Sequence, residues 1–203
     1  MKQAIGTIPL FGLESGKFHD AVLFQGVDLA TLQGIEASWT PMFDTAAAEN
    51  RPEDAHWEWA AKALQALQNP LNYEIFGIEA DGKTQGMMLV VKGGAKCFSR
   101  HPEHPRMPLV YVDFLATAPW NRRGLIESPT YKGVGRVLFM SAVSLSIEEE
   151  FAGRVALHSL PGAEAFYRDR LSMTDLGADG DYQNLRYFEL STTQARQLIS
   201  AWP

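Results

Sequence analysis

The sequence predicts a mixed α/β fold built on one central sheet. Strand-like segments come mostly before the helices, and a succession of strand, helix and strand follows at residues 109–158. A right-handed crossover makes the two strands of such a succession parallel, whereas the hairpin expected at 73–91 is antiparallel. This order of elements favours a mixed sheet over a doubly wound one.

Length and composition fit a single domain over residues 1–203. The chain is 46% hydrophobic and 21% charged, as is typical of soluble globular proteins. Its net charge of −6 gives no attraction to nucleic acid, and its only cysteine, Cys97, excludes an intramolecular disulfide. No run approaches the ~20 apolar residues of a membrane span. We therefore expect a cytoplasmic protein that binds neither nucleic acid nor membrane.

In the first half of the chain, residues 21–29 predict an extended segment, and the stretch up to Thr45 shows turn residues without a clear period. A helix is expected from Pro52 to Asn69, because apolar residues recur there at helical spacing. It places Trp57 and Trp59 on different faces, so one packs in the core while the other borders an acceptor groove.

The second half contains the strand, helix and strand succession. Residues 109–117 form a long apolar run that stops before Pro119, residues 134–145 carry a helical stripe, and 154–158 predict a short strand. The remaining predicted elements are a short helix, a strand and a closing helix, at 163–170, 184–190 and 193–201.

A glycine turn lies between the apolar strand and the helix, in Lys132-Gly133-Val134-Gly135-Arg136. Backbone N–H groups and the positive end of the helix dipole can hold a phosphate at such a point. A Gly-x-Gly taken alone is more often a simple tight turn. The flanking strand, helix and following strand favour the binding interpretation.

Three short motifs then follow in order: Thr117-Ala118-Pro119, Lys132-Gly133-Val134-Gly135 and Ala163-Glu164-Ala165-Phe166-Tyr167. Over roughly residues 109–173 this order resembles the GNAT superfamily of N-acetyltransferases. In that family a strand with a V-x-P-like end precedes an R/Q-x-x-G-x-G/A loop that binds the pyrophosphate of coenzyme A (CoA). The resemblance implies a mixed, mostly antiparallel sheet with a parallel βαβ unit that binds acyl-CoA, and an N-acetyltransferase that uses acetyl-CoA as acyl donor.

Two departures from the family pattern concern the phosphate loop. Arg122 lies three residues after Pro119, as in the family, but the glycine pair comes only after an insertion at 123–130. Counted back from Gly133, the Arg/Gln position is occupied by Thr130. Either the pyrophosphate contacts shift toward Lys132 and Arg136, or Arg122 folds back.

The resemblance implies that the end of the strand and the glycine turn bind the cofactor. The residues are Leu115, Thr117, Arg122, Lys132, Gly133, Val134, Gly135 and Arg136. It also implies that Tyr167 protonates the departing thiolate, since an ordinary phenol with a pKa of about 10 stays protonated at neutral pH. The alternative for Tyr167 is a partly buried tyrosine that holds its helix beside Phe166.

Asp113 is a candidate general base, because the two-residue period of a strand places it on one face with Tyr111, Leu115 and Thr117. It is equally readily interpreted as a carboxylate paired with an arginine in the sheet. His158 is a secondary candidate, although a histidine at a strand end is more often structural. We expect no metal site, since His101-Pro102-Glu103-His104 resembles a solvated loop, and no role for Cys97.

The acceptor is expected to be an amine, carried either by a small molecule or by a protein or peptide, and the sequence leaves homodimerisation open. A second interpretation is a catalytically inactive acyl-CoA-binding or regulatory module with the same fold. A nucleotide-binding protein is a weaker third, because the G-x-x-x-x-G-K-[ST] pattern is missing.

Overall fold

The computed structural model describes residues 1–202. It divides into two compact units, one made of Met1–Leu89 and Phe114–Leu138, the other of Val90–Asp113 and the described residues from Phe139 onward. The described strands are ordered β6-β1-β2-β3-β4-β5-β7-β9-β8. The predicted mixed, mostly antiparallel sheet is confirmed. The expectation of a single domain stays a prediction.

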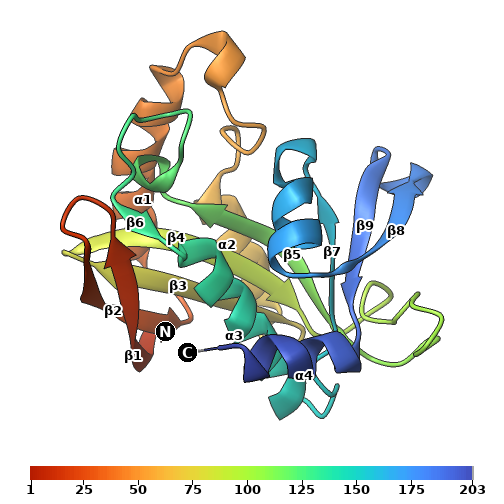
Figure 1. The fold of residues 1–203 in the computed structure, drawn as a ribbon. Coiled ribbons are helices and arrows are strands. Elements are labelled where there is room, and N and C mark those ends of the chain that lie inside the picture. The colour runs from red at the N-terminus through yellow and green to blue at the C-terminus, as the bar shows by residue number, and fades with distance from the viewer. Residues whose placement is uncertain (203) are drawn as a thin grey trace. The chain divides into compact units, whose positions relative to one another are not determined.

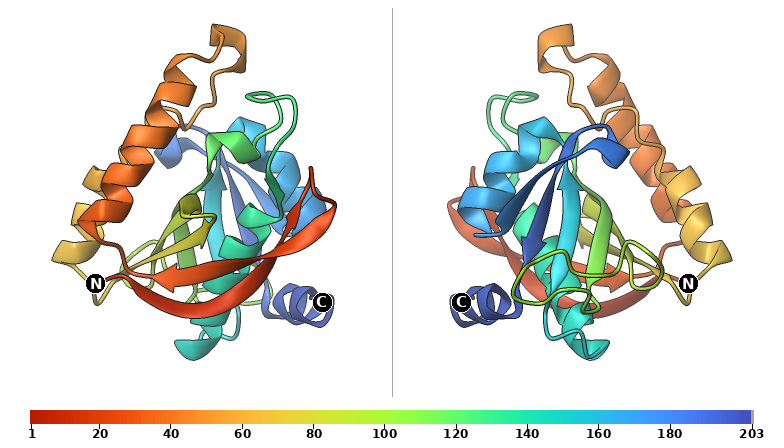
Figure 2. Two further views of the ribbon diagram at one scale, coloured as in Figure 1. Left: turned by 90° about the vertical axis from the view of Figure 1, so that its left-hand side faces the viewer. Right: turned by 90° about the vertical axis from the view of Figure 1, so that its right-hand side faces the viewer.

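The first unit begins with a long hairpin of β1 (Gln3–Gly12) and β2 (Lys17–Gln25), which is strongly curved (Figure 2). β2 continues in antiparallel register with β3 (Tyr73–Ala80), and β4 (Lys83–Val91) follows after a two-residue turn. The hairpin of β3 and β4 was predicted. Strand β1 was not predicted from the sequence, and the strand that is β2 was predicted four residues too late.

Helix α1 (Leu29–Asp44) occupies the stretch predicted to lack a regular period, so that prediction was wrong. Asp28 caps it by accepting a hydrogen bond from the Thr31 N–H at 2.8 Å. Its buried residues include Leu32, Ile35, Trp39 and Phe43, which do follow helical spacing. Gly34 and Pro41 inside the helix conceal that pattern in the sequence.

Helix α2 (Trp59–Gln68) begins later than predicted, because residues 53–56 form a turn and residues 57–58 are not helical. It packs beside α1 (Figure 2), and the two helices share a core with β3, β4 and the end of β5. Two tryptophans, Trp39 and Trp59, are buried there with ring centroids 6.4 Å apart. Trp57 is only partly buried.

The second unit contains the start of β5 (Val110–Thr117), and with it β7 (Val155–Ser159), β9 (Leu185–Leu190) and β8 (Thr174–Asp179). β7 and β8 each pair with β9 in antiparallel register (Figure 1). Strand β8 was not predicted from the sequence.

Two helical segments of the second unit lie late in the chain. The predicted short helix appears as a π-helical turn at Phe166–Arg170. The closing helix α4 (Thr192–Ser200) starts with a capping box formed by Ser191 and Gln194.

The predicted βαβ unit is present as β5, helix α3 (Val134–Glu148) and β7. β5 and β7 are parallel, with Val110–Val112 opposite Val155–Leu157, and β5 continues to Thr117. Among residues 1–202, every helix is too short or too polar to cross a membrane.

Candidate active site

The connection from β5 to α3 lies in the first unit and contains the insertion predicted at 123–130. A 3-10 turn at Pro119–Asn121 comes first, and a two-residue strand, β6 (Tyr131–Lys132), comes last. The backbone N–H of Thr130 donates to the carbonyl of Trp120 at 2.8 Å, and the N–H of Tyr131 donates to Oδ1 of Asn121 at 2.9 Å. The insertion is therefore a closed loop whose two ends are held together.

Strand β6 fixes this loop to the sheet by pairing with Phe11 and Gly12 of β1. Tyr131 is buried, and its hydroxyl donates to the carboxylate of Asp81. Burial, first, and the hydrogen bond to Asp81 raise the pKa of Tyr131 to about 12. The chain thus enters α3 from a fixed point despite the insertion.

Gly133 makes the turn into α3 with φ of +94°, a conformation that residues with a Cβ rarely adopt. The space where its Cβ would lie has no atom within 4 Å. Lys132 and Gly133 are exposed, and the first amides of a helix have no carbonyl partner within the helix. This point of the chain therefore presents N–H donors and one ammonium group to an anion.

A glycine on β4 sets the position of the helix start relative to β5. A Cβ built on Gly86 would come within 2.6 Å of Cγ1 of Val134 and 3.1 Å of the carbonyl oxygen of Ala116. Only glycine lets α3 approach this closely. The first turn of α3 is therefore packed beside the carboxyl-terminal half of β5, where Leu115 and Thr117 lie.

Arg122 donates its hydrogen bonds to groups of the first unit. Its Nε donates to the carbonyl of Thr117 at 2.8 Å, and its two terminal nitrogens hold both oxygens of Asp54 at 2.6 and 2.7 Å. Both side chains are mostly buried. Arg122 thus joins the end of β5 to the turn before α2, and its predicted contact with CoA stays a prediction. Asp54 was not predicted as a partner of Arg122, because no local sequence pattern joins the two residues.

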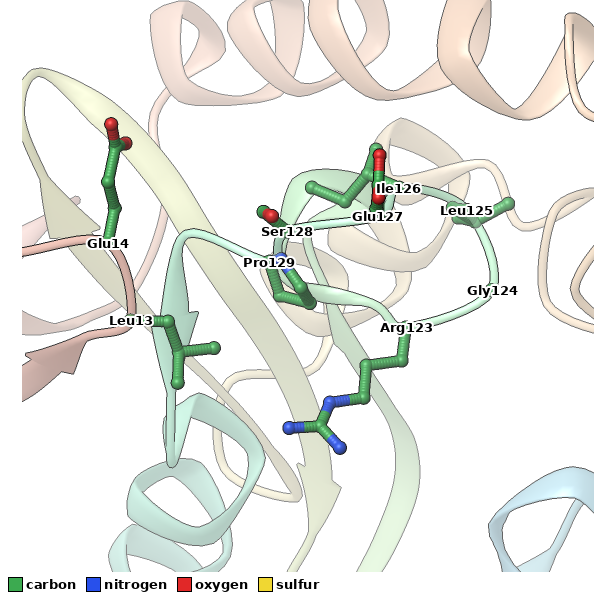
Figure 3. Close-up of a pocket in the computed structure, with 9 residues that line it drawn as sticks. All are labelled: Leu13, Glu14, Arg123, Gly124, Leu125, Ile126, Glu127, Ser128 and Pro129. Carbon is green, nitrogen blue, oxygen red and sulfur yellow. The ribbon is translucent and has the colours of Figure 1, made fainter.

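The neighbouring Arg123 lies in a different environment. It lines an open pocket of about 930 Å³ together with Leu13, Glu14 and the rest of the loop 124–129. Figure 3 shows its guanidinium and the carboxylate of Glu14 pointing in opposite directions. The insertion therefore carries a second positively charged side chain, Arg123, in a pocket large enough for part of a cofactor.

The candidate acid and base lie in the second unit. Tyr167 is buried among aromatic rings, with centroids 5.1 Å from Phe166, 6.0 Å from Phe188 and 6.4 Å from Phe139. Asp113 accepts a hydrogen bond from the Lys96 ammonium at 2.9 Å. The partner of Asp113 is thus a lysine rather than the arginine considered above. Both catalytic roles stay predictions.

His158 is at the centre of a buried polar cluster in the same unit. Its Nε2 lies 2.9 Å from a carboxylate oxygen of Asp179 and its Nδ1 lies 2.6 Å from the hydroxyl of Tyr111. Because a carboxylate accepts, Nε2 carries the proton and Nδ1 accepts from Tyr111 in the neutral ring. The imidazole also stacks on Tyr182 at 4.0 Å. This arrangement matches the structural interpretation of His158.

The pKa values of the cluster follow from burial and charge. Burial lowers the pKa of His158, against the opposing effect of Asp179. Hydrogen bonds from Arg100, first, and from His158 lower the pKa of Asp179 to about 2. Burial raises the pKa of Tyr111, so its phenol stays protonated. Neither Asp179 nor Arg100 carries a local sequence signal, and both were missed.

Two further sequence observations can be placed. Cys97 is buried, and burial raises its pKa to about 11, so its thiol is a poor nucleophile. Within residues 1–202, no group of three or more His, Cys, Asp or Glu side chains is arranged to hold a metal ion.

No protein-family model matches this sequence, and no curated protein matches it either. Solved structures do resemble the fold. A protein assigned to the GNAT family of acetyltransferases from Desulfovibrio desulfuricans superposes with a TM-score of 0.54 over 85% of this chain and 99% of its own, at 10% identity. The chain has the GNAT fold.

Two further structures with the GNAT fold extend the comparison. An N-acetyltransferase from Staphylococcus aureus Mu50 has a TM-score of 0.52 over 86% of this chain and 99% of its own, at 15% identity. The PaiA N-acetyltransferase from Thermoplasma acidophilum, solved in complex with CoA, has a TM-score of 0.51 over 82% of this chain and 97% of its own, at 11% identity. At these identities the likeness establishes the fold alone.

Proposed function

We propose that this protein is an N-acetyltransferase that transfers the acetyl group of acetyl-CoA to a primary amine. The observation that carries the proposal is the start of α3, where the Gly133 turn presents helix amides beside the carboxyl-terminal half of β5. The GNAT fold of the chain and the CoA complex of a structural neighbour support it.

The proposed diphosphate site consists of the first-turn amides of α3, from Val134, Gly135 and Arg136, with the exposed ammonium of Lys132. The open space at Gly133 fits a phosphate that must approach the backbone closely. Arg123 supplies positive charge from the inserted loop. It takes the place of the Arg/Gln of the family pattern, which this chain lacks. Arg122 contributes indirectly, because it holds the carbonyl of Thr117.

Acetyl transfer to an amine needs a base, donors for the thioester oxygen and an acid for the thiolate. Backbone N–H groups between Leu115 and Thr117 are the proposed donors, since the parallel register of β5 with β7 covers only Val110–Val112. Tyr167 is the proposed acid and Asp113 the proposed base. In each cycle the carboxylate of Asp113 must then either separate from Lys96 or accept the proton by way of the Lys96 amino group.

Titration calorimetry with CoA and acetyl-CoA tests the binding step. We expect saturable heat with one site per chain. A second assay measures thiol release from acetyl-CoA with a panel of small amines and lysine peptides, which separates the two acceptor classes. An absence of binding heat for both ligands would refute the proposal.

Two observations favour the inactive acyl-CoA-binding module as a second candidate. The side chain of Asp113 is neutralised by Lys96, and Tyr167 is 6% exposed. The same two assays decide between the candidates, because tight CoA binding without acceptor-dependent thiol release supports the module.

A further inference from the structure

A lysine ammonium lies on an aromatic surface in the first unit. Nζ of Lys62, on α2, is 3.3 Å from the ring centroid of Phe114 and 5.1 Å from that of Trp57. The two rings meet edge to face with centroids 4.9 Å apart. All three side chains are partly buried. A cation at this distance from an aromatic face is held by the ring quadrupole.

Phe114 lies in β5, beside a proposed part of the active site. Phe114 directly precedes Leu115–Thr117, the segment whose amides the proposed function assigns to the thioester. Lys62 therefore brings a primary amine onto the strand that is proposed to hold the acyl group. It is the only lysine in residues 18–82, so this region has no second internal amine of the same kind.

The surrounding segment is strongly acidic. Residues 28–68 contain seven acidic and two basic side chains, a net charge of −5, compared with −6 for the whole chain. Such a concentration of negative charge retains a cation and attracts others. The amine of Lys62 thus lies where a cationic acceptor would also be drawn.

We propose, on the basis of the acetyltransferase function above, that Lys62 is an internal acceptor that the protein acetylates on itself. The ammonium of Lys62 first releases one proton to solvent, and the neutral Nζ then forms a bond to the carbonyl carbon of acetyl-CoA as the carbon–sulfur bond breaks. Nζ loses a second proton, the departing thiolate takes up one proton, and the products are acetyl-lysine and CoA with one proton released overall. No further reactant is needed.

Acetylation changes the aromatic surface. An acetylated lysine has no charge and loses its attraction to the rings of Phe114 and Trp57. The modified side chain leaves that surface open to the ammonium group of another molecule. Lys62 acetylation therefore releases a contact that competes with a cationic acceptor.

The test is peptide mass spectrometry on the full chain after incubation with acetyl-CoA. Lys83 is the matched control, since its exposed Nζ lies 5.6 Å from the ring centroid of Trp120 and reports chemical acetylation of a lysine near an aromatic ring. We expect Lys62 to be modified at least about tenfold faster than Lys83. The rate should not change when the protein is diluted, because the step is intramolecular.

A Lys62→Arg variant should lose the modification and keep its heat of CoA binding, since arginine retains the contact with the rings. Normal CoA binding with Lys62 modified no faster than Lys83 overturns this inference and leaves the proposed function standing. A rate that rises with protein concentration also overturns it. No CoA binding overturns both.

Discussion

The start of α3 and the His158 cluster differ in how their polar groups are used. At the start of α3, Lys132 and Gly133 are exposed, and the first helix amides have no partner within the helix. In the His158 cluster, both ring nitrogens are hydrogen-bonded, and the side chain of His158 is 3% exposed. The backbone donors of the first region can bind a ligand, whereas the polar groups of the second region are hydrogen-bonded to one another.

Shifted pKa values alone do not mark an active site, because structural ion-pair networks also produce them. The His158 cluster contains several shifted groups, but burial and ion pairing account for them. The start of α3 is marked by other features, namely an exposed glycine turn and helix amides without a partner in the helix. It is the better binding candidate because of backbone geometry, which titration does not report.

The largest expected effect tests whether the binding region also holds the fold together. Arg122→Ala should lower the free energy of unfolding by about 3 kcal/mol, because Asp54 is left mostly buried without its bidentate partner. Urea denaturation measures this.

Arg51→Ala is the matched control for Arg122→Ala. It breaks an exposed pair with Asp44 and should cost less than about 0.5 kcal/mol. Equal losses in the two variants would contradict a structural role for Arg122.

The next effect concerns catalysis. Tyr167→Phe should lower acceptor-dependent turnover by about 100-fold, since the thiolate loses its proton donor. The affinity for CoA should stay within about twofold. Stopped assays of thiol release and calorimetry provide the two numbers.

Tyr111→Phe serves as the comparison from the His158 cluster. It removes a hydroxyl that hydrogen-bonds to His158 and should leave turnover unchanged. Unchanged turnover in Tyr167→Phe would exclude Tyr167 as the acid.

Gly133→Ala should weaken CoA binding by about tenfold, or about 1.4 kcal/mol, because the turn must relax away from a positive φ. Gly177→Ala is its control, since Gly177 on β8 has φ of +95° and equally open surroundings. Both variants should lose similar stability, and only Gly133→Ala should lose affinity in calorimetry. Equal affinity losses would remove the α3 amides from the proposed site.

The smallest effect is a pH dependence in the His158 cluster. Since the pKa of His158 is lowered from 6.5 in the folded protein, the unfolded chain binds its proton first as the pH falls. Stability should therefore decrease from about pH 6.5 downward. Asp179 has a pKa lowered from 3.8 to about 2, so its protonation decreases the stability further only at more acidic pH.

His158→Gln should flatten the first part of this curve. Urea midpoints at pH 7.5 and 5.5 test the prediction, and CoA affinity should not change in the variant. A pH profile identical to that of the unmodified protein would show that His158 does not titrate on unfolding.

The fold was predictable where neighbouring residues carry the signal. The β3–β4 hairpin, the strand at 110–117, helix α3 and the strand at 155–159 each have a local period or turn residue. Helix α1 had such a period too, with Asp28 as its cap, but Gly34 and Pro41 hid it. Strands β1, β6 and β8 lacked a strong enough local pattern, and their pairing with distant strands defines them.

The sequence by itself determined the β3–β4 hairpin, the strand, helix and strand succession at 110–159 and the glycine turn before α3, because helix, strand and turn propensities act between near neighbours. Only the tertiary structure decided the partners of its charged side chains. Arg122 meets Asp54, and Asp113 meets Lys96, across separations that no local pattern encodes. Burial makes such pairing necessary, since a charge removed from water is stable only beside a partner.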